Sequence, residues 1–183
     1  MNSSFGSALA FTLKWEGGFE GMSDDPTDRG GRTRAGITQI AFDAWLRGMN
    51  ATPGRDVWTI TPDEVESIYL QNYWTPCRCD PLPEKLDLCV FDAAVNHGNR
   101  KAIQFLQRAA GVVDDGVFGP QTMRAVDQDQ SPERMQQLLA SYCLARDKYY
   151  AAIVANDPRQ VRFLKGWRNR LTDLRITIGV DVV

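Results

Sequence analysis

The stretch FTLKWEGGFEGMSDDPTDRGGRTRAGITQ, residues 11–39, decides how the rest of this sequence is interpreted. Apolar residues recur with a helical period up to Trp15, and the pattern stops at Glu16, directly before Gly17-Gly18. Glycine adopts the left-handed conformation that ends many helices without a steric penalty. The sequence therefore predicts a helix that ends on a single carboxylate.

The chemistry of Glu16 follows from this position. The C-terminal end of a helix carries partial negative charge, which disfavours an ionised carboxylate. Trp15 and Phe19 would add desolvation, and both effects favour the protonated acid. A protonated glutamic acid can serve as the general acid of glycoside cleavage, which also needs a second, ionised carboxylate. The E-G-G step alone, however, is more typical of a solvated helix end without a catalytic role.

An acidic, glycine-rich loop with a small hairpin over residues 33–38 is expected after the helix. Asp25 lies in this polar loop and precedes Pro26, which favours an extended backbone. It is our first candidate for the second carboxylate. Asp28 is the reserve candidate, and its alternative role is to hold the turn at Gly30-Gly31.

The rest of the chain predicts a mainly α fold. A helix capped by Thr38 is expected over residues 40–47, and T-P-D-E at residues 61–64 is a capping box. The run LDLCVFDAAV, residues 86–95, is apolar on nearly every side and predicts a buried central helix. Further helices are expected over residues 101–110, after the turn at 114–122, from Ser131-Pro132 to about 153, and over 161–178.

Three motifs carry a resemblance to a known family. Residues 16–19 read E-G-G-F, residues 25–33 fit D-P-x-D-x-G-G-x-T, and residues 36–38 read G-I-T. In this order they resemble the N-acetylmuramidases of glycoside hydrolase family 108, in which tyrosine is commoner at the position of Phe19. Residues 69–76 and 82–98 are similar to the family's middle segment. Residues 102–126, with D-G-x-x-G-P-x-T, are similar to its C-terminal peptidoglycan-binding segment.

The resemblance implies a lysozyme-like helical fold that cleaves the β-1,4 bond between N-acetylmuramic acid and N-acetylglucosamine in peptidoglycan. It places the essential glutamate on Glu16. The spacing to Asp25 is similar to that of phage-type lysozymes, which keep a hydroxyl where Thr38 stands. The resemblance suggests a catalytic region over residues 1–90 and a peptidoglycan-binding-like region over 91–183, which we expect to share one core.

Candidate substrate-binding residues are aromatic or polar. Phe19, Tyr73 and Trp74 are candidates for stacking on sugar rings, whereas Tyr69 and Trp45 lie at helical spacing and are interpreted as core residues. Asn96 and His97 are expected at a helix C-terminus, where they would line the cleft.

Composition restricts the other function classes. The net charge of −2 indicates no nucleic-acid partner, and no apolar run is long enough for stable membrane insertion. No signal peptide is visible, so we expect cytoplasmic synthesis with four free cysteines. Their C-x-C spacing disfavours a zinc site, and we expect no metal or other cofactor. Six basic residues against two acids after residue 157 are interpreted as a solvated helix face rather than a contact to an anionic surface.

Two other functions stay open at this point. A lytic transglycosylase would need a single acid, and Asp25 and Thr38 argue against it. A non-catalytic wall-binding or secretion-helper protein would use the D-G-x-x-G-P-x-T segment without Glu16. The compact length favours a phage endolysin that acts as a monomer on peptidoglycan in the periplasm and needs a holin or another export route. Bacterial wall remodelling during secretion is the alternative setting.

Overall fold

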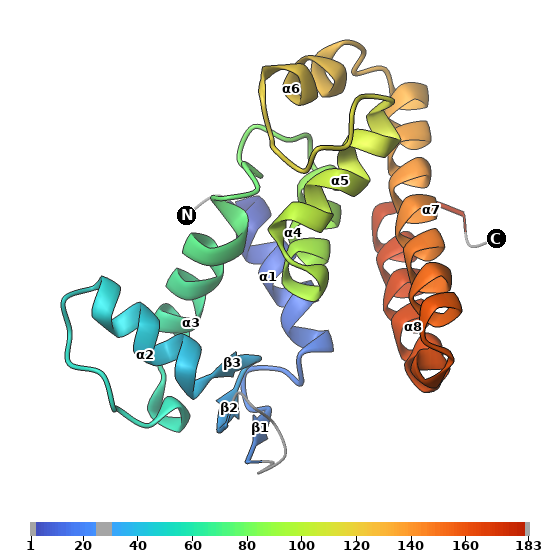
Figure 1. Cartoon of the computed structure of the whole chain (residues 1–183). Coiled ribbons are helices and arrows are strands. Elements are labelled where there is room, and N and C mark those ends of the chain that lie inside the picture. The colour runs from blue at the N-terminus through green and yellow to red at the C-terminus, as the bar shows by residue number, and fades with distance from the viewer. Residues whose placement is uncertain (1–2, 25–30, 182–183) are drawn as a thin grey trace. The chain divides into compact units, whose positions relative to one another are not determined.

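The computed structural model describes residues 3–24 and 31–181, and the chain divides into two compact units (Figure 1). The first unit spans Met1–Asn72 and the second Tyr73–Val183. Helices α1–α3 and a small sheet belong to the first unit, and helices α4–α8 belong to the second. The predicted mainly α architecture is confirmed for the described residues. The expectation that two regions divided near residue 90 share one core stays a prediction.

The helices of the first unit begin and end at the expected signals. They are α1 (Ser3–Trp15), α2 (Gln39–Gly48) and α3 (Pro62–Tyr69). Thr61 and Glu64 form the predicted capping box at the start of α3. This helix continues into a π-helical turn (Leu70–Trp74), in which the chain passes into the second unit.

A three-stranded antiparallel sheet follows α1, in the order β1 (Met22–Ser23), β2 (Thr33–Arg34) and β3 (Ile37–Thr38). Thr33 pairs with Thr38, which confirms the predicted hairpin. The third strand, β1, pairs with β2 and had no signal in the sequence. Because β3 runs directly into α2, the sheet also fixes the start of that helix.

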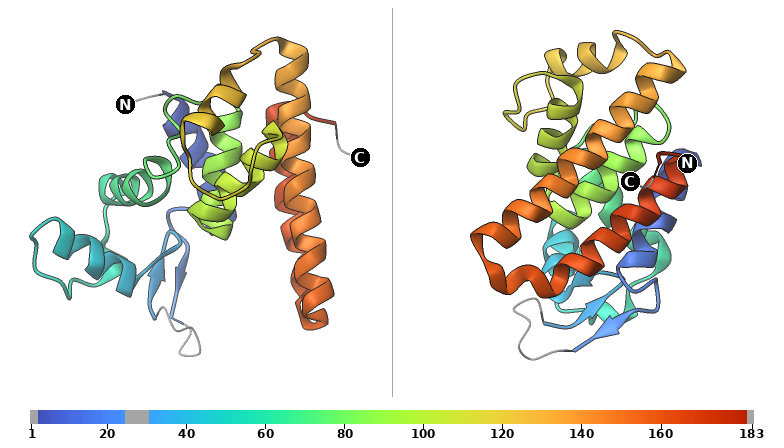
Figure 2. Two further views of the ribbon diagram at one scale, coloured as in Figure 1. Left: turned by 45° about the horizontal axis from the view of Figure 1, so that its top comes forward. Right: turned by 90° about the vertical axis from the view of Figure 1, so that its right-hand side faces the viewer.

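The second unit is helical throughout its described elements. They are α4 (Leu86–His97), α5 (Asn99–Ala110), α6 (Pro120–Asp127), α7 (Pro132–Asn156) and α8 (Val161–Ile178). Helix α5 packs against α4, α6 and α7, and α7 packs against α8. Both views of Figure 2 show α7 and α8 side by side as a helical hairpin.

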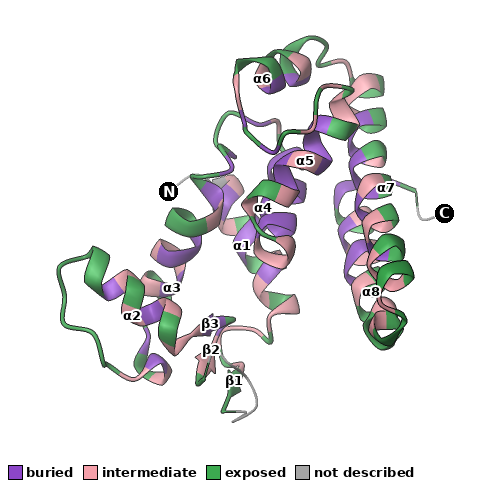
Figure 3. Cartoon of the chain, in the orientation of Figure 1, coloured by how far each residue is buried: buried purple, intermediate pink, exposed green. Residues whose placement is uncertain are grey.

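Helix α4 is buried on most of its surface, as predicted (Figure 3). Its buried residues include an aspartate, Asp92, with no exposed surface. Oδ2 of Asp92 accepts a hydrogen bond from Arg146 of α7 at 2.6 Å, and Oδ1 accepts one from Arg170 of α8 at 2.7 Å. Burial alone would raise the pKa of Asp92, but the two guanidinium groups lower it below its ordinary value. An ion network therefore joins three helices inside the second unit.

This network corrects one prediction. Arg170 belongs to the C-terminal basic segment that was interpreted as a solvated helix face, yet it is only 5% exposed. The helical period explains the difference. Arg170 is adjacent to Leu171 and one turn before Leu174, both buried, so it lies on the inward face of α8.

Candidate active site

Glu16 lies immediately after α1, at the position that the sequence predicts. The backbone N–H of Gly18 donates to the carbonyl of Leu13 at 2.7 Å, and Gly17 has a φ of +90°. This is the hydrogen bond of a Schellman motif, with Gly17 in the left-handed position. It makes Glu16 the last residue before the chain turns, where the half-buried side chain meets the negative end of the helix.

A tight turn between β2 and β3 lies against the Glu16 side chain. Gly36, in this turn, has a φ of +73°. A Cβ atom placed on Gly36 would lie 2.6 Å from the Tyr69 hydroxyl oxygen and 3.1 Å from Cβ of Glu16. The Tyr69 hydroxyl donates to the carbonyl oxygen of Ala35 at 2.9 Å. The E-G-G-F and G-I-T motifs therefore meet at Glu16, and only glycine fits at the contact.

Tyr69 is buried, which confirms its interpretation as a core residue. Sequence reasoning missed what its hydroxyl does, because helical spacing shows that a ring faces the core and not which carbonyl its hydroxyl reaches. The hydroxyl connects α3 to the turn that covers Glu16.

Arg34 holds the segment that follows Glu16. Its guanidinium carbon lies 4.6 Å from the centre of the Phe19 ring, and its Nε donates to the Phe19 carbonyl at 3.4 Å. Nη1 donates to the carbonyl of Trp58, and Nη2 forms an ion pair with Glu20 at 3.2 Å. One arginine thus fixes both the backbone and the ring of Phe19. A sequence signal for Arg34 existed only in its place within the hairpin.

The described carboxylates of the acidic loop are paired with arginines. Glu20 contacts Arg34, and Asp24 contacts Arg32 at 3.2 Å. Arg32 also pairs with Asp56 at 2.6 Å. Asp25 and Asp28, the candidates for the second catalytic carboxylate, lie outside the described residues, so their roles stay predictions.

Thr38 caps α2, as predicted. Its hydroxyl oxygen accepts a hydrogen bond from the backbone N–H of Ala41 at 3.2 Å. The cap uses the hydroxyl oxygen only as an acceptor, so the hydroxyl group can still donate its proton in a second hydrogen bond. A structural role for Thr38 is therefore established, and a catalytic role stays a prediction.

The prediction that Trp74 stacks on a sugar ring is wrong. Trp74 has no exposed surface, its Nε1 donates to Asp80 at 2.9 Å, and its ring meets Phe91 edge-on with centres 5.6 Å apart. The sequence did not separate it from its neighbour Tyr73, which is half-buried, because the π-helical turn shifts the helical register at this point.

Asn96 and His97 occupy the predicted C-terminal end of α4 and adjoin the buried ion network. Oδ1 of Asn96 accepts from Arg146 at 3.4 Å, and Nε2 of His97 lies 3.3 Å from the Tyr150 hydroxyl. Burial lowers the pKa of His97 to about 3, and the positive charge of Arg146 adds to this. The oxygen of Tyr150 also accepts a hydrogen bond from Arg146 at 2.8 Å, so the Tyr150 hydroxyl connects His97 to the ion network.

The D-G-x-x-G-P-x-T segment is a loop held by one glutamine. Nε2 of Gln107 donates to Asp115 at 2.7 Å and to the Thr122 hydroxyl at 3.2 Å, and its Oε1 accepts from the backbone N–H of Gly116 at 2.8 Å. Gln107 is only 2% exposed. The aspartate and the threonine of the motif thus serve the fold of the loop, and Gln107 is a partner that the motif itself does not include.

The four cysteines are buried free thiols in the second unit. Burial raises the pKa of Cys77 to about 12 and that of Cys79 well above its ordinary value. Thiolates, the form that zinc binds, are therefore disfavoured there. Within residues 3–24 and 31–181, no three His, Cys, Asp or Glu side chains are grouped so that they could hold a metal ion. No described helix combines the length and the apolar character of a membrane span.

Comparisons with known proteins agree with this arrangement. A family model described as "Glycosyl hydrolase 108" matches residues 9–98, and one described as "Predicted Peptidoglycan domain" matches residues 101–172. The solved "Structure of Brucella abortus SagA" has 28% sequence identity and a TM-score of 0.75. That match covers 97% of this chain and 95% of the Brucella abortus chain. A comparison with curated proteins finds no match.

These findings confirm the lysozyme-like, mainly α fold class and the resemblance first carried by the E-G-G-F and G-I-T motifs. Glu16, Gly36 and Tyr69 all lie within the matched hydrolase residues. The chain therefore contains a glycosyl hydrolase 108 domain over residues 9–98 and a predicted peptidoglycan domain over residues 101–172.

Proposed function

We propose that this glycoside hydrolase is a muramidase, which cleaves the β-1,4 bond between N-acetylmuramic acid and N-acetylglucosamine with Glu16 as the general acid. The convergence on Glu16 carries the proposal. The end of α1 and the backbone of Gly36 both lie at its side chain, and the hydroxyl of Tyr69 holds the turn that contains Gly36. The peptidoglycan domain that follows the hydrolase domain supports the choice of polymer.

In this mechanism Glu16 donates its proton to the glycosidic oxygen as the bond to the anomeric carbon breaks. A second carboxylate stabilises the positive charge that develops on the sugar or activates the attacking group. We assign this role to Asp25, with Asp28 as the reserve. Thr38 would place its hydroxyl proton near the attacked carbon. Water supplies the hydroxyl group of the new reducing end, and its remaining proton returns Glu16 to its acid form.

Phe19, Tyr73, Asn96 and His97 stay candidate substrate contacts. Arg34 covers one face of the Phe19 ring, and Tyr73 is half-buried. His97 is neutral at the pH of the cell, because its pKa is about 3. It would therefore act as a hydrogen-bonding group rather than as a cation.

Digestion of purified sacculi by the full chain tests the proposal. The Glu16→Gln variant keeps the size of the side chain and removes its proton, so the rate should fall at least ~10²-fold, the low end of general-acid contributions. Glu84→Gln is the matched control, since Glu84 is exposed in the second unit. A Glu16→Gln variant that clears sacculi at the wild-type rate would exclude Glu16 as the acid.

Asp25→Asn and Asp28→Asn separate the two candidate carboxylates. We expect Asp25→Asn to lose far more activity than stability, and Asp28→Asn to lose both together. If Asp25→Asn stays active while Asp28→Asn folds normally and is inactive, Asp28 is the second catalytic carboxylate and Asp25 is not.

Mass spectrometry of the released fragments identifies the reaction. Reducing N-acetylmuramic acid ends indicate hydrolysis, whereas 1,6-anhydro ends indicate a lytic transglycosylase. Sacculus binding without release would indicate a non-catalytic wall-binding protein. We place the reaction at the cell wall as that of an endolysin. Host lysis that depends on a co-expressed holin tests this setting against a role in wall remodelling.

A further inference from the structure

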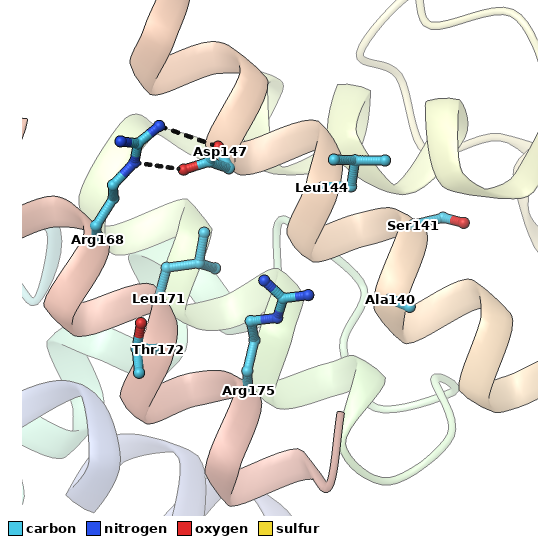
Figure 4. A pocket seen from close by; sticks show the side chains of 8 residues that line it. All are labelled: Ala140, Ser141, Leu144, Asp147, Arg168, Leu171, Thr172 and Arg175. Atoms are coloured by element: carbon cyan, nitrogen blue, oxygen red, sulfur yellow. Dashed lines mark hydrogen bonds and ion pairs between the residues drawn. The ribbon is translucent and has the colours of Figure 1, made fainter. Parts of the chain in front are cut away.

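A pocket of about 610 Å³ lies between α7 and α8 in the second unit (Figure 4). Its volume falls within the roughly 300–1,000 Å³ typical of small-molecule sites. The side chains that line it are Ala140, Ser141, Leu144 and Asp147 of α7 and Arg168, Leu171, Thr172 and Arg175 of α8. The proposed hydrolysis uses none of these residues.

The two arginines of the pocket differ in their partners. Arg168 forms two hydrogen bonds with Asp147, of 2.8 and 3.3 Å. Arg175 extends from α8 into the space between the helices (Figure 4). Its Nε atom is buried and has no hydrogen-bond partner in the described part of the chain. A buried donor without a partner is unfavourable, so an acceptor that reaches the Arg175 guanidinium would stabilise this position.

The charge of the lining favours a single negative charge on the ligand. Arg168 and Arg175 contribute two positive charges and Asp147 one negative charge, which leaves +1. The guanidinium fork matches the geometry of a carboxylate. Because Asp147 already occupies Arg168, one guanidinium remains for the ligand.

The rest of the lining suits a small aliphatic group joined to amides. Leu144 and Leu171 form an apolar wall, and Leu144 is 52% exposed. The hydroxyl groups of Ser141 and Thr172 supply hydrogen-bond donors and acceptors. A methyl group beside a carboxylate and a peptide bond would use both kinds of surface.

We propose that this pocket binds the terminal carboxylate of a short alanine-containing peptide, the chemistry of the stem peptides of peptidoglycan. The inference rests on the proposed function, because that function presents stem peptides to the protein. It gives the second unit a recognition site for the peptide, in addition to the glycan contacts proposed for the hydrolase domain.

Isothermal titration of the full chain with N-acetyl-D-alanyl-D-alanine tests the proposal, with the C-terminal amide of the same dipeptide as the neutral probe. The acid should bind at least about tenfold more tightly than the amide, since a charge-assisted hydrogen bond contributes that much. Equal binding of the two probes, or no binding of the acid, overturns the proposal. Inorganic phosphate that competes as well as the dipeptide would show a general anion site and would also overturn it.

Three substitutions locate the binding. Arg175→Gln should weaken binding of the acid at least about tenfold. Arg124→Gln, the same change at an exposed position of α6, should leave it unchanged. Asp147→Asn releases Arg168 and raises the charge of the lining from +1 to +2, so it should tighten binding. An unchanged affinity in both Arg175→Gln and Asp147→Asn would place the dipeptide elsewhere.

The Glu16→Gln variant separates this inference from the proposed function. It should lose sacculus cleavage and bind the dipeptide with the wild-type affinity. Cleavage without dipeptide binding refutes the pocket alone, and dipeptide binding without cleavage by the wild-type chain refutes the muramidase alone.

Discussion

The hydroxyl of Tyr69 donates a hydrogen bond to the carbonyl oxygen of Ala35, 2.9 Å away, and thereby fixes the turn that lies against Glu16. This contact joins α3 to the β2–β3 turn. It makes the position of the proposed general acid depend on a buried residue of another element. Tyr69 is in this sense a positioning residue.

Tyr69→Phe should therefore reduce activity more than it disturbs the fold. The ring stays in the core, while the Ala35 carbonyl loses its partner at a cost of about 1–3 kcal/mol. We expect kcat on sacculi to fall with KM little changed, and thermal unfolding to show a modest loss of stability. A fall in stability with unchanged kcat would assign Tyr69 a purely structural role.

Gly36→Ala is expected to be far more damaging. The added Cβ would meet the Tyr69 hydroxyl at 2.6 Å and Glu16 at 3.1 Å, and the φ of +73° strains any other residue. Activity should fall at least about tenfold, because a misplaced catalytic group costs rate even when the chain folds. Gly48→Ala is the control, since a Cβ there meets nothing within 4 Å. Near wild-type activity of Gly36→Ala would contradict the close contact.

Arg34→Gln should loosen the segment that carries Phe19. The substitution removes the cation over the Phe19 ring and the ion pair with Glu20. The exposed pair to Glu20 contributes little, so the main effect should come from the partly buried bonds to Phe19 and Trp58. We expect KM to rise and proteolysis near residue 19 to become faster. Glu20→Gln removes only the ion pair and should leave both measurements near wild type.

Asp92→Asn tests the buried ion network. The change leaves Arg146 and Arg170 without their counter-charge in the interior, and the loss of one partner of a buried pair costs about 3–5 kcal/mol. Chemical denaturation should show this loss. Asp147→Asn breaks a partly exposed pair and should cost about 0–1 kcal/mol. Equal effects of the two variants would contradict the burial of Asp92.

His97 should make stability depend on pH in a predictable direction. Its pKa in the folded chain is about 3, below its ordinary value near 6.5, because of burial and of Arg146. Between these values the unfolded chain binds a proton that the folded chain does not, so the free energy of unfolding falls as the pH falls. The slope reaches at most about 1.4 kcal/mol per pH unit for one group.

Replacement of His97 by glutamine isolates the contribution of this residue to the pH dependence of stability. Arg146, Arg170, Lys101 and Asp92 remain in both proteins, so the wild type minus His97→Gln difference reports His97 alone. We expect this difference to shrink between about pH 7 and pH 5. A difference that does not change with pH would show that folding leaves the pKa of His97 at its ordinary value.

The sequence predicted those features that local signals specify. The helix end at Glu16, the capping box at Thr61 and the buried helix α4 each follow from residues within one or two turns. The contacts around the candidate site could not be predicted in this way, because Tyr69 and Arg34 reach it from other elements and no short pattern encodes such contacts. The prediction for Trp74 was wrong for a related reason, since a π-helical turn changes which residues face inward.

Gln107 connects the aspartate, the glycine and the threonine of the D-G-x-x-G-P-x-T loop from within the fold. The loop and the candidate active site are therefore subject to different selection, one for folding and one for activity. We expect the loop to be preserved by its own folding requirement, and Glu16, the proposed general acid, only as long as cleavage is useful. A descendant that loses the glutamate would still keep the loop and its helices. The loop motif in a newly sequenced genome therefore reports ancestry, and hydrolytic activity has to be inferred from the glutamate itself.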